Sequence, residues 1–240
     1  MGVKRRKDIE QEAARAARKQ ERKSRKAALV QEPNLERAEG TEPLRKKIIL
    51  FAEGKNTETS YFKQFNSSLV TIETVGTGKS TCKLVNEAII LLQSKYKNKQ
   101  FNEKWVVFDK DDNNDFGDAI QLARRSGFKV AYSNQAIEYW FILHFNDHQG
   151  GVIHRDRYSD LINQYINPYG AVYDETKVVS NEFFDIMLAN DLQTGKSRLQ
   201  LAVDRADKIH KGKRDKTEES VTTIHHLIQS ITGIKCSKKK

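Results

Sequence analysis

The sequence is poor in the residues that mark disulfide-rich, zinc-binding and membrane proteins. Its 240 residues include only two cysteines, Cys82 and Cys236, which lie far apart. This spacing gives no zinc or redox pattern and suits a reducing cytoplasm. No apolar run approaches the ~20 residues that a membrane span needs, and no hydrophobic signal segment follows the first methionine. We therefore expect a cytoplasmic protein without a membrane partner.

The positive charge is concentrated near the amino terminus. The chain carries 42 Lys and Arg against 32 Asp and Glu, which gives a net charge of +10. Residues 1–31 hold 11 of the basic and 4 of the acidic residues, a surplus of +7 that leaves +3 for the rest. A basic segment on a nearly balanced body predicts attraction to a polyanion, and nucleic acid is the first candidate. A solubilising tail explains the same charge equally well.

The pattern of apolar residues divides the chain into three parts. Residues 1–45 are a basic extension without an apolar stripe, ending in a linker with two prolines and a glycine. Residues 46–134 alternate short apolar runs with helical periodicity, which predicts an α/β fold with a parallel sheet of about four strands flanked by helices. Residues 135–240 read mostly as helices that complete the domain. The strands are expected at KKIILFAE, LVTIETV, KWVVFD and FKVAYS.

The stretch VGTGKST at residues 75–81 looks like a nucleotide phosphate loop but lacks its first glycine. Glu73 stands at that position, where the backbone would have to curl around an anion. The pattern therefore argues against an ATPase, and no nucleotide cofactor is expected. Lys79 and Ser80, at the start of a predicted helix, are still candidates for binding one phosphate of a nucleic-acid backbone.

Acidic residues follow two of the predicted strands. Glu53 ends the first strand, and Asp109 and Asp111 end the third. Sites in open parallel sheets gather at the carboxyl ends of the strands, and residues two apart in a strand share a face. If the strands are neighbours, the carboxylates converge, and oxygen ligands of this kind predict Mg²⁺ or Mn²⁺. The plainer alternative is that these acids cap helices or lie in solvated loops; a longer strand would put Asp112 in place of Asp111.

Histidines give no metal pattern at the level of sequence. His144 and His148 are one helical turn apart, but Phe145 stands where a zinc protease has glutamate. No cysteine supports a zinc site there. We expect His144 to pack within an aromatic helix and His148 to face solvent.

The pairing of a Glu-Gly strand end with an Asp-x-Asp strand end resembles the Toprim domain, a metal-binding fold of topoisomerases, primases and OLD-type nucleases. The segments AEGKNTETSYF, VVFDKDD, SNQAIEYWFILHF and EESVTTIHHLI together resemble the RloB-like family of prokaryotic proteins, over Ile48 to Ile231. The resemblance implies a metal-dependent nuclease of DNA or RNA, tRNA included, associated with restriction loci and phage defence. Related nucleases often work beside a separate ABC-type ATPase.

The resemblance also implies roles for single residues. It makes Glu53, Asp109 and Asp111 the metal ligands, and it makes Glu58 a candidate for a second metal or for orienting water. Glu58 could equally complement the dipole of its helix. Glu138 stands in an otherwise aromatic, apolar helix, where a carboxylate is costly to bury unless it is paired. A role near the metal is therefore favoured for Glu138.

Other assignments stay open at this stage. Lys79, Lys110 and Lys177 could offset charge in the transition state of phosphodiester cleavage. A non-catalytic nucleic-acid-binding or scaffold protein of a defence complex would explain the basic segment without chemistry. A nucleotide-using enzyme acting through Lys79 is a third hypothesis. The sequence is compatible with a homo-oligomer.

Overall fold

The structure, a computed structural model, describes residue 20 and residues 45–110, 114–148, 155–212 and 220–237. The chain divides into two units, Met1–Pro43 and Leu44–Lys240, and the fold belongs to the second. In chain order the elements are β1 (Lys46–Ala52), α2 (Thr57–Lys63), β2 (Val70–Gly76), α3 (Thr81–Gln93), β3 (Glu103–Lys110), α4 (Phe116–Arg125), β4 (Lys129–Asn134), α5 (Glu138–Ile142), η1 (Arg155–Arg157), α6 (Tyr158–Ile166), η2 (Asn167–Tyr169), α7 (Asn181–Leu188), α8 (Arg198–Gly212) and α9 (Ile224–Thr232).

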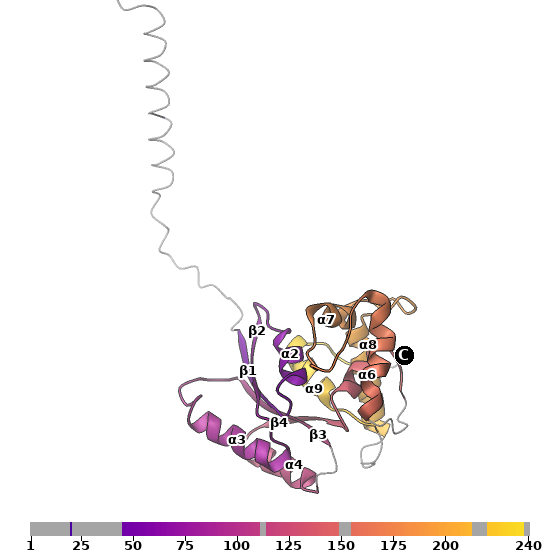
Figure 1. Ribbon diagram of the computed structural model, residues 1–240. Coiled ribbons are helices and arrows are strands. Elements are labelled where there is room, and N and C mark those ends of the chain that lie inside the picture. Colours follow the sequence, from indigo (N-terminus) through magenta and orange to yellow (C-terminus); the bar gives the residue numbers. More distant parts are fainter. Residues whose placement is uncertain (1–19, 21–44, 111–113, 149–154, 213–219, 238–240) are drawn as a thin grey trace, which may run out of the picture. The chain divides into compact units, whose positions relative to one another are not determined.

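The four strands form one parallel sheet in the order β2-β1-β3-β4 (Figure 1). This confirms the predicted α/β fold, with a strand at each of the four predicted segments. β1 pairs with both β2 and β3, because the chain crosses back over it between those two strands. The pairing aligns Ala52 with Val107, and the amide of Glu53 donates to the carbonyl oxygen of Val107 at 3.1 Å. The carboxyl ends of β1 and β3 therefore lie side by side.

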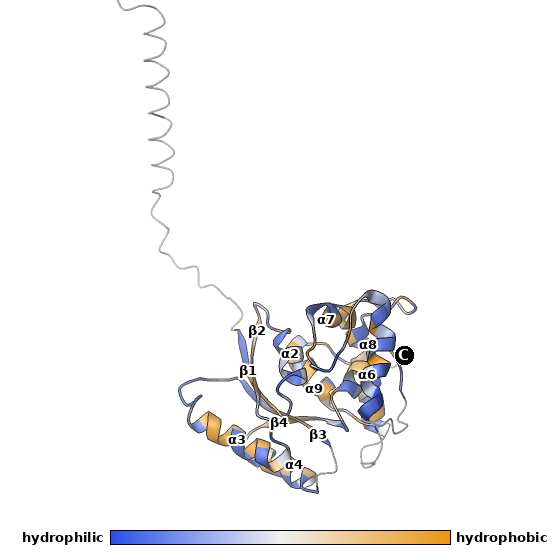
Figure 2. Ribbon diagram, in the orientation of Figure 1, coloured by the Kyte–Doolittle hydropathy of each residue, from blue (hydrophilic) through white to orange (hydrophobic). Residues whose placement is uncertain are grey.

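Helices cover both faces of the sheet. One face packs against α3 and α4, and the other packs against α2 and the helices from α5 onward (Figure 1). In β3, Val106 and Phe108 point to the first face, whereas Trp105 and Val107 point to the second. Asp109 continues this alternation and so lies on the second face. In Figure 2 the hydrophobic colouring runs through the strands and along α3, in keeping with a sheet buried between two layers.

The C-terminal helices share one core with the sheet, as the sequence predicts. Trp140 of α5 is fully buried, and its Nε1 donates to the hydroxyl of Tyr61 in α2 at 2.8 Å. His144 is buried against the Trp140 ring with centroids 4.9 Å apart, which confirms its packing role. His148 is half-buried rather than fully exposed, since the Tyr139 ring lies 5.8 Å from its own. Within the described ranges, no helix is both long and apolar enough to cross a bilayer.

The segment before α9 pairs with the outer edge of β4. The sequence pattern predicts a helix over the whole of EESVTTIHHLIQSI, but α9 begins only at Ile224, because residues before it bond to the strand. The amide of Asn134 donates to the carbonyl oxygen of Val221 at 2.7 Å, and Thr222 forms an antiparallel bridge with Ser133. Backbone groups of an edge strand need such partners. This pairing covers part of the β4 edge and explains why the helix starts late.

A partly buried ionic network ties α9 to the start of the sheet. Oε1 of Glu103 lies 2.7 Å from Nζ of Lys46 and 3.1 Å from Nζ of Lys129. Its Oε2 accepts hydrogen bonds from the Ser230 hydroxyl of α9 at 2.6 Å and from Nε1 of Trp105 at 2.7 Å. Burial alone would raise the pKa of Glu103, but these donors outweigh it and lower the pKa to about 2. The ionised carboxylate therefore stabilises the folded state.

We expect Glu103→Gln to lower the free energy of unfolding by about 1–2 kcal/mol at neutral pH, a value discounted for partial solvation. Because the folded-state pKa lies below the ordinary value of 4.5, the stabilisation is present above pH 4.5 and is lost as the pH falls toward 2. Urea unfolding of both proteins, at neutral pH and near pH 3, measures the difference. A difference that does not shrink at the lower pH would show that ionisation of Glu103 is not its cause.

Candidate functional site

Four acidic residues from separate elements lie at or near the carboxyl edge of the sheet. Glu53 directly follows β1, and Asp109 is the last residue but one of β3; both are half-buried. Glu58 lies in the first turn of α2 and is 3% exposed. Glu138 begins α5 and is 6% exposed. Asp111, the remaining predicted ligand, lies outside the described residues, as does its alternative Asp112.

The glycine of the Glu-Gly strand end makes room for the carboxylate of Glu58. The amide of Gly54 donates to Oε1 of Glu58 at 3.1 Å. A Cβ on Gly54 would lie 1.9 Å from Oε2 of the same carboxylate, so the close approach requires glycine. Burial raises the pKa of Glu58, and the negative charge of Glu138 raises it further. The hydrogen bond from the Gly54 amide and the positive charge of Lys177 both lower it. Glu58 and Glu138 are therefore close enough to repel each other.

Tyr173 is hydrogen-bonded to one of the two buried carboxylates, that of Glu138. Its hydroxyl donates to Oε1 of Glu138 at 2.9 Å and lies 3.3 Å from the hydroxyl of Thr57. Burial raises the pKa of Tyr173 strongly, and the charges of Glu138 and Glu58 raise it further. The ammonium of Lys177 lies 4.0 Å from the same Glu138 oxygen. Glu138 thus has one buried hydroxyl donor and one partly exposed cation beside it.

A second buried tyrosine, Tyr158, feels the charges of two of these carboxylates. Burial raises the pKa of Tyr158 to about 12, and the charges of Glu138 and Asp109 add to this effect. Because the influence of a charge falls off with distance, both carboxylates lie in the wider neighbourhood of this hydroxyl.

Neither tyrosine could be singled out from the sequence, since tyrosine belongs to no metal-binding or acid–base motif in this chain. The segment that carries Tyr173 is brought to α2 by hydrogen bonds between residues distant in sequence. The amide of Val179 donates to the Ser60 hydroxyl at 2.9 Å, and Nε2 of Gln64 donates to the Val179 carbonyl oxygen at 2.9 Å. No local sequence pattern predicts these contacts.

The site has the donor set for a hard divalent cation. Glu53 and Asp109 supply carboxylate oxygens from neighbouring strands, and Mg²⁺ and Mn²⁺ prefer such ligands. Buried carboxylates that repel one another also fit a site that receives positive charge. Among the described residues, however, no three acidic side chains bring their oxygens within 4.8 Å of one another. A complete ligand set would need Asp111, or a movement of side chains on binding.

The backbone amides of the glycine loop after β2 form hydrogen bonds with the end of β1. The amides of Thr77 and Gly78 donate to the two carbonyl oxygens at the end of β1, both at 2.9 Å. These amides are consequently turned away from any phosphate. Ser80 is the N-cap residue of α3, and its side chain makes no capping hydrogen bond. Phosphate binding by Lys79 and Ser80 stays a prediction.

The three lysines singled out in the sequence lie in different surroundings. Nζ of Lys79 pairs with Glu87 at 2.6 Å on the surface of α3. Nζ of Lys110 lies 5.8 Å from the Phe116 ring, on the face of the sheet opposite to Asp109. Lys177 lies beside a carboxylate of the acidic site, with its Nζ 4.0 Å from Oε1 of Glu138.

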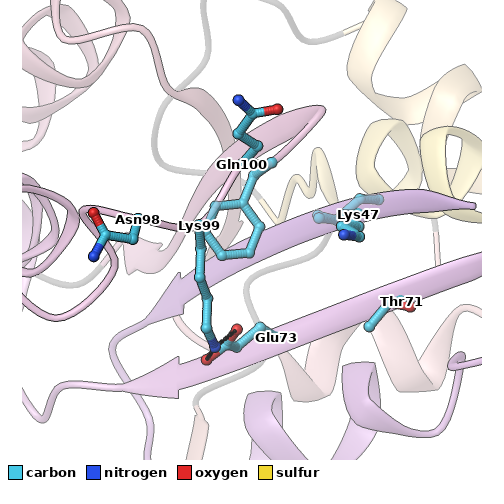
Figure 3. A pocket seen from close by; sticks show the side chains of 8 residues that line it. Lys47, Thr71, Glu73, Asn98, Lys99 and Gln100 are labelled. Atoms are coloured by element: carbon cyan, nitrogen blue, oxygen red, sulfur yellow. Dashed lines mark hydrogen bonds and ion pairs between the residues drawn. The ribbon is translucent and has the colours of Figure 1, made fainter.

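Two open cavities border β2, and one of them adjoins the acidic edge. The cavity in Figure 3, of about 510 Å³, lies over the first half of β1 and β2, where Lys99 reaches the carboxylate of Glu73 at 2.8 Å. The other, of about 450 Å³, is lined by α2 and the end of β2 and includes Lys55 and Lys63. Lys55 follows the Glu-Gly strand end directly in the sequence, so this second cavity has a basic lining near the end of β1.

Comparison with known proteins gives one informative result. A family model described as RloB-like protein matches residues 48–231, well over half of the chain. The matched range contains all the acidic residues of the site and both tyrosines. Searches of curated proteins and of solved structures found no match.

We expect Gly54→Ala to destabilise the protein by about 2–3 kcal/mol, because the added methyl group takes the space of a buried carboxylate. The matched control is Gly117→Ala in α4, where a Cβ meets nothing within 4 Å. The control should be neutral or stabilising by up to about 1 kcal/mol. Urea unfolding at neutral pH measures both values.

A double-mutant cycle identifies the cause. If the clash is with Glu58, the cost of Gly54→Ala should shrink by roughly half or more in a Glu58→Ala background. Strict additivity of the two substitutions would mean that the glycine is required for another reason.

Proposed function

The chain belongs to the RloB-like family, and on this premise we propose that it is a divalent-cation-dependent nuclease with a Toprim-type acidic centre. The observation that carries the proposal is the gathering of Glu53, Asp109, Glu58 and Glu138 at one edge of a parallel sheet, two of them buried. Burying carboxylates close together is unfavourable without a cation or a proton to relieve it. Such an arrangement is typical of sites that act on phosphate esters.

The proposed reaction is in-line attack of water on a phosphodiester of DNA or RNA. Glu53 and Asp109, with Asp111, would hold Mg²⁺ or Mn²⁺. When bound, such an ion polarises a phosphoryl oxygen and makes water more acidic. The strand ends position both carboxylates without help from a flexible loop, since Glu53 is bonded to β3 through its own amide.

The buried carboxylates have a separate task in this proposal. Glu58 and Glu138 orient the attacking water and accept its proton, while solvent water protonates the leaving oxygen. Tyr173 holds Glu138 in place through its 2.9 Å hydrogen bond. Lys177, 4.0 Å from Glu138, offsets the charge that develops on the phosphoryl group.

The basic cavity beside the site supports a polyanionic substrate. Lys55 and Lys63 line it, together with the hydroxyl groups of Thr59 and Ser60. Lysines and hydroxyl groups are common partners of backbone phosphates, which position a nucleic acid without reading its sequence. The surplus of +7 in residues 1–31 would strengthen the same attraction.

We also propose that the nuclease acts in phage defence with a separate ABC-type ATPase. The family resemblance supports this partner. A second support is the glycine loop after β2, whose amides at Thr77 and Gly78 are already used by the end of β1. A chain that lacks an open phosphate loop would depend on another chain for ATP hydrolysis.

A second candidate function is that of a non-catalytic nucleic-acid-binding or scaffold protein in a defence complex. The concentration of basic residues in residues 1–31 favours it. Nucleic-acid binding of this kind would weaken steeply with salt, would not respond to a chelator, and would leave the substrate intact.

We expect Asp109→Asn to reduce Mn²⁺- or Mg²⁺-dependent cleavage roughly 100- to 1000-fold, because it removes a negative ligand from the acidic centre. The substrates are end-labelled single- and double-stranded DNA and total RNA, with and without chelator. Each reaction is run with and without an ABC-type ATPase added as the proposed partner.

The control for this experiment is Asp185→Asn, which removes an exposed carboxylate from α7. Both variants should keep the melting temperature of the parent protein within about 2–4 °C, the shift that roughly 1 kcal/mol produces in a chain of this size. Full activity of Asp109→Asn would reject the acidic centre. Chelator-insensitive binding without any product, with the ATPase present, would favour the second candidate.

A further inference from the structure

Three histidines of α8 and α9 form a cluster that includes none of the carboxylates above. Each of His210, His225 and His226 offers one ring nitrogen, and these nitrogens all lie within 4.8 Å of one another. The ring centroids are 5.8 Å apart for His210 and His225, 5.5 Å for His210 and His226, and 4.0 Å for the adjacent pair. In the part of the chain that the structure describes, this is the one group of three metal-ligating side chains so close together.

The central member of this histidine cluster is buried without hydrogen bonds. His225 has no exposed surface, and neither of its ring nitrogens has a hydrogen-bond partner of normal geometry among the described residues. The Thr222 backbone lies near the ring and raises the pKa of His225, as the smallest of the effects on it. A neutral imidazole carries one donor and one acceptor nitrogen, and burying both unsatisfied is unfavourable. A metal ion would satisfy the acceptor nitrogen.

The surroundings of the cluster are compatible with a bound metal ion. His225 is fully buried beside His226 and His210, and a neutral imidazole is the form that binds metals. Asp207 lies one turn before His210 in α8 and could accept the second ring N–H of a metal-bound histidine. Its partner is Lys211, at 2.6 Å. Carboxylates near metal-bound imidazoles commonly play this part.

We propose that His210, His225 and His226 bind one Zn²⁺-type transition-metal ion, with water in the fourth position. Three imidazoles and an open position are a common zinc ligand set. With Zn–N bonds of about 2.1 Å, the ligand atoms of a tetrahedral site are about 3.4 Å apart. The three ring nitrogens lie within 4.8 Å of one another, so small side-chain rotations would bring them to that spacing. Soft or borderline nitrogen ligands also separate this site from the oxygen-only acidic centre, which suits Mg²⁺ or Mn²⁺.

The ion would join the end of α8 to the start of α9. α9 is in turn attached to the sheet, because the amide of Tyr132 donates to the Thr223 hydroxyl at 2.9 Å. The hydroxyls of Ser133 and Thr222 are 2.7 Å apart in the same contact. Metal binding would therefore hold the segment that covers the β4 edge, next to the acidic centre, and should stabilise the folded chain.

The test uses the untagged full-length chain, stripped with chelator and then given Zn²⁺ or Co²⁺. We expect about one zinc per chain to survive gel filtration and to raise the melting temperature. Co²⁺ should show the intense visible absorption of a low-coordinate site. His226→Gln, which alters an exposed residue, and His210→Asn should each weaken zinc binding by about 100-fold or more, because each removes one of three ligands.

Two controls separate this site from the others. His148→Gln removes a histidine outside the cluster, and Asp109→Asn removes a ligand of the acidic centre; both should keep zinc affinity. Near-ultraviolet circular dichroism confirms that each variant is folded. The proposal is wrong if zinc is not retained, or if both cluster variants retain it like the parent. Loss of zinc from Asp109→Asn alone would assign the metal to the acidic centre.

Discussion

The parallel pairing of β1 with β3 is the constraint on which the rest of the structure depends. These strands are not consecutive, and their pairing brings Glu53 beside the end of β3 through the hydrogen bond to Val107. If β2 lay between β1 and β3, the acidic residues at the ends of those two strands would be about 5 Å further apart, which is the spacing of one strand. The same pairing places Asp109 on the face where α2 and the C-terminal helices pack.

Around that edge, the structure offsets the cost of buried negative charge with a few polar contacts. Glu58 accepts from the Gly54 amide, and Glu138 accepts from Tyr173. Neither contact neutralises a carboxylate, and Lys177 lies at the limit of an ion pair with Glu138. Interior packing elsewhere in the domain holds these groups together, through aromatic residues of α2 and α5 such as Tyr61 and Trp140. The acidic edge therefore retains buried negative charge that the rest of the fold has to hold in place.

Most secondary structure could be predicted because its signals are local. The four strands follow from short apolar, β-branched runs, and α3 and α8 follow from apolar residues at helical spacing. Glu53 and Asp109 could be singled out because they end predicted strands of a parallel sheet, and Glu138 because a carboxylate is costly in an apolar helix. Glu58 was singled out through the family resemblance. The start of α9 was predicted too early, because its preceding residues bond to Ser133 and Asn134 of β4, far away in the sequence.

The sequence by itself determined which segments are strands or helices, and it marked the acidic residues, because those properties depend on spacing along the chain. Only the tertiary structure decided the strand order, the neighbourhood of Tyr173 and Tyr158, and the meeting of His210 with His225 and His226. Each of these depends on contacts between side chains or backbone groups remote in sequence. Such contacts produce no periodic pattern in the sequence, because the folding of the whole domain, and not local preference, brings these residues together.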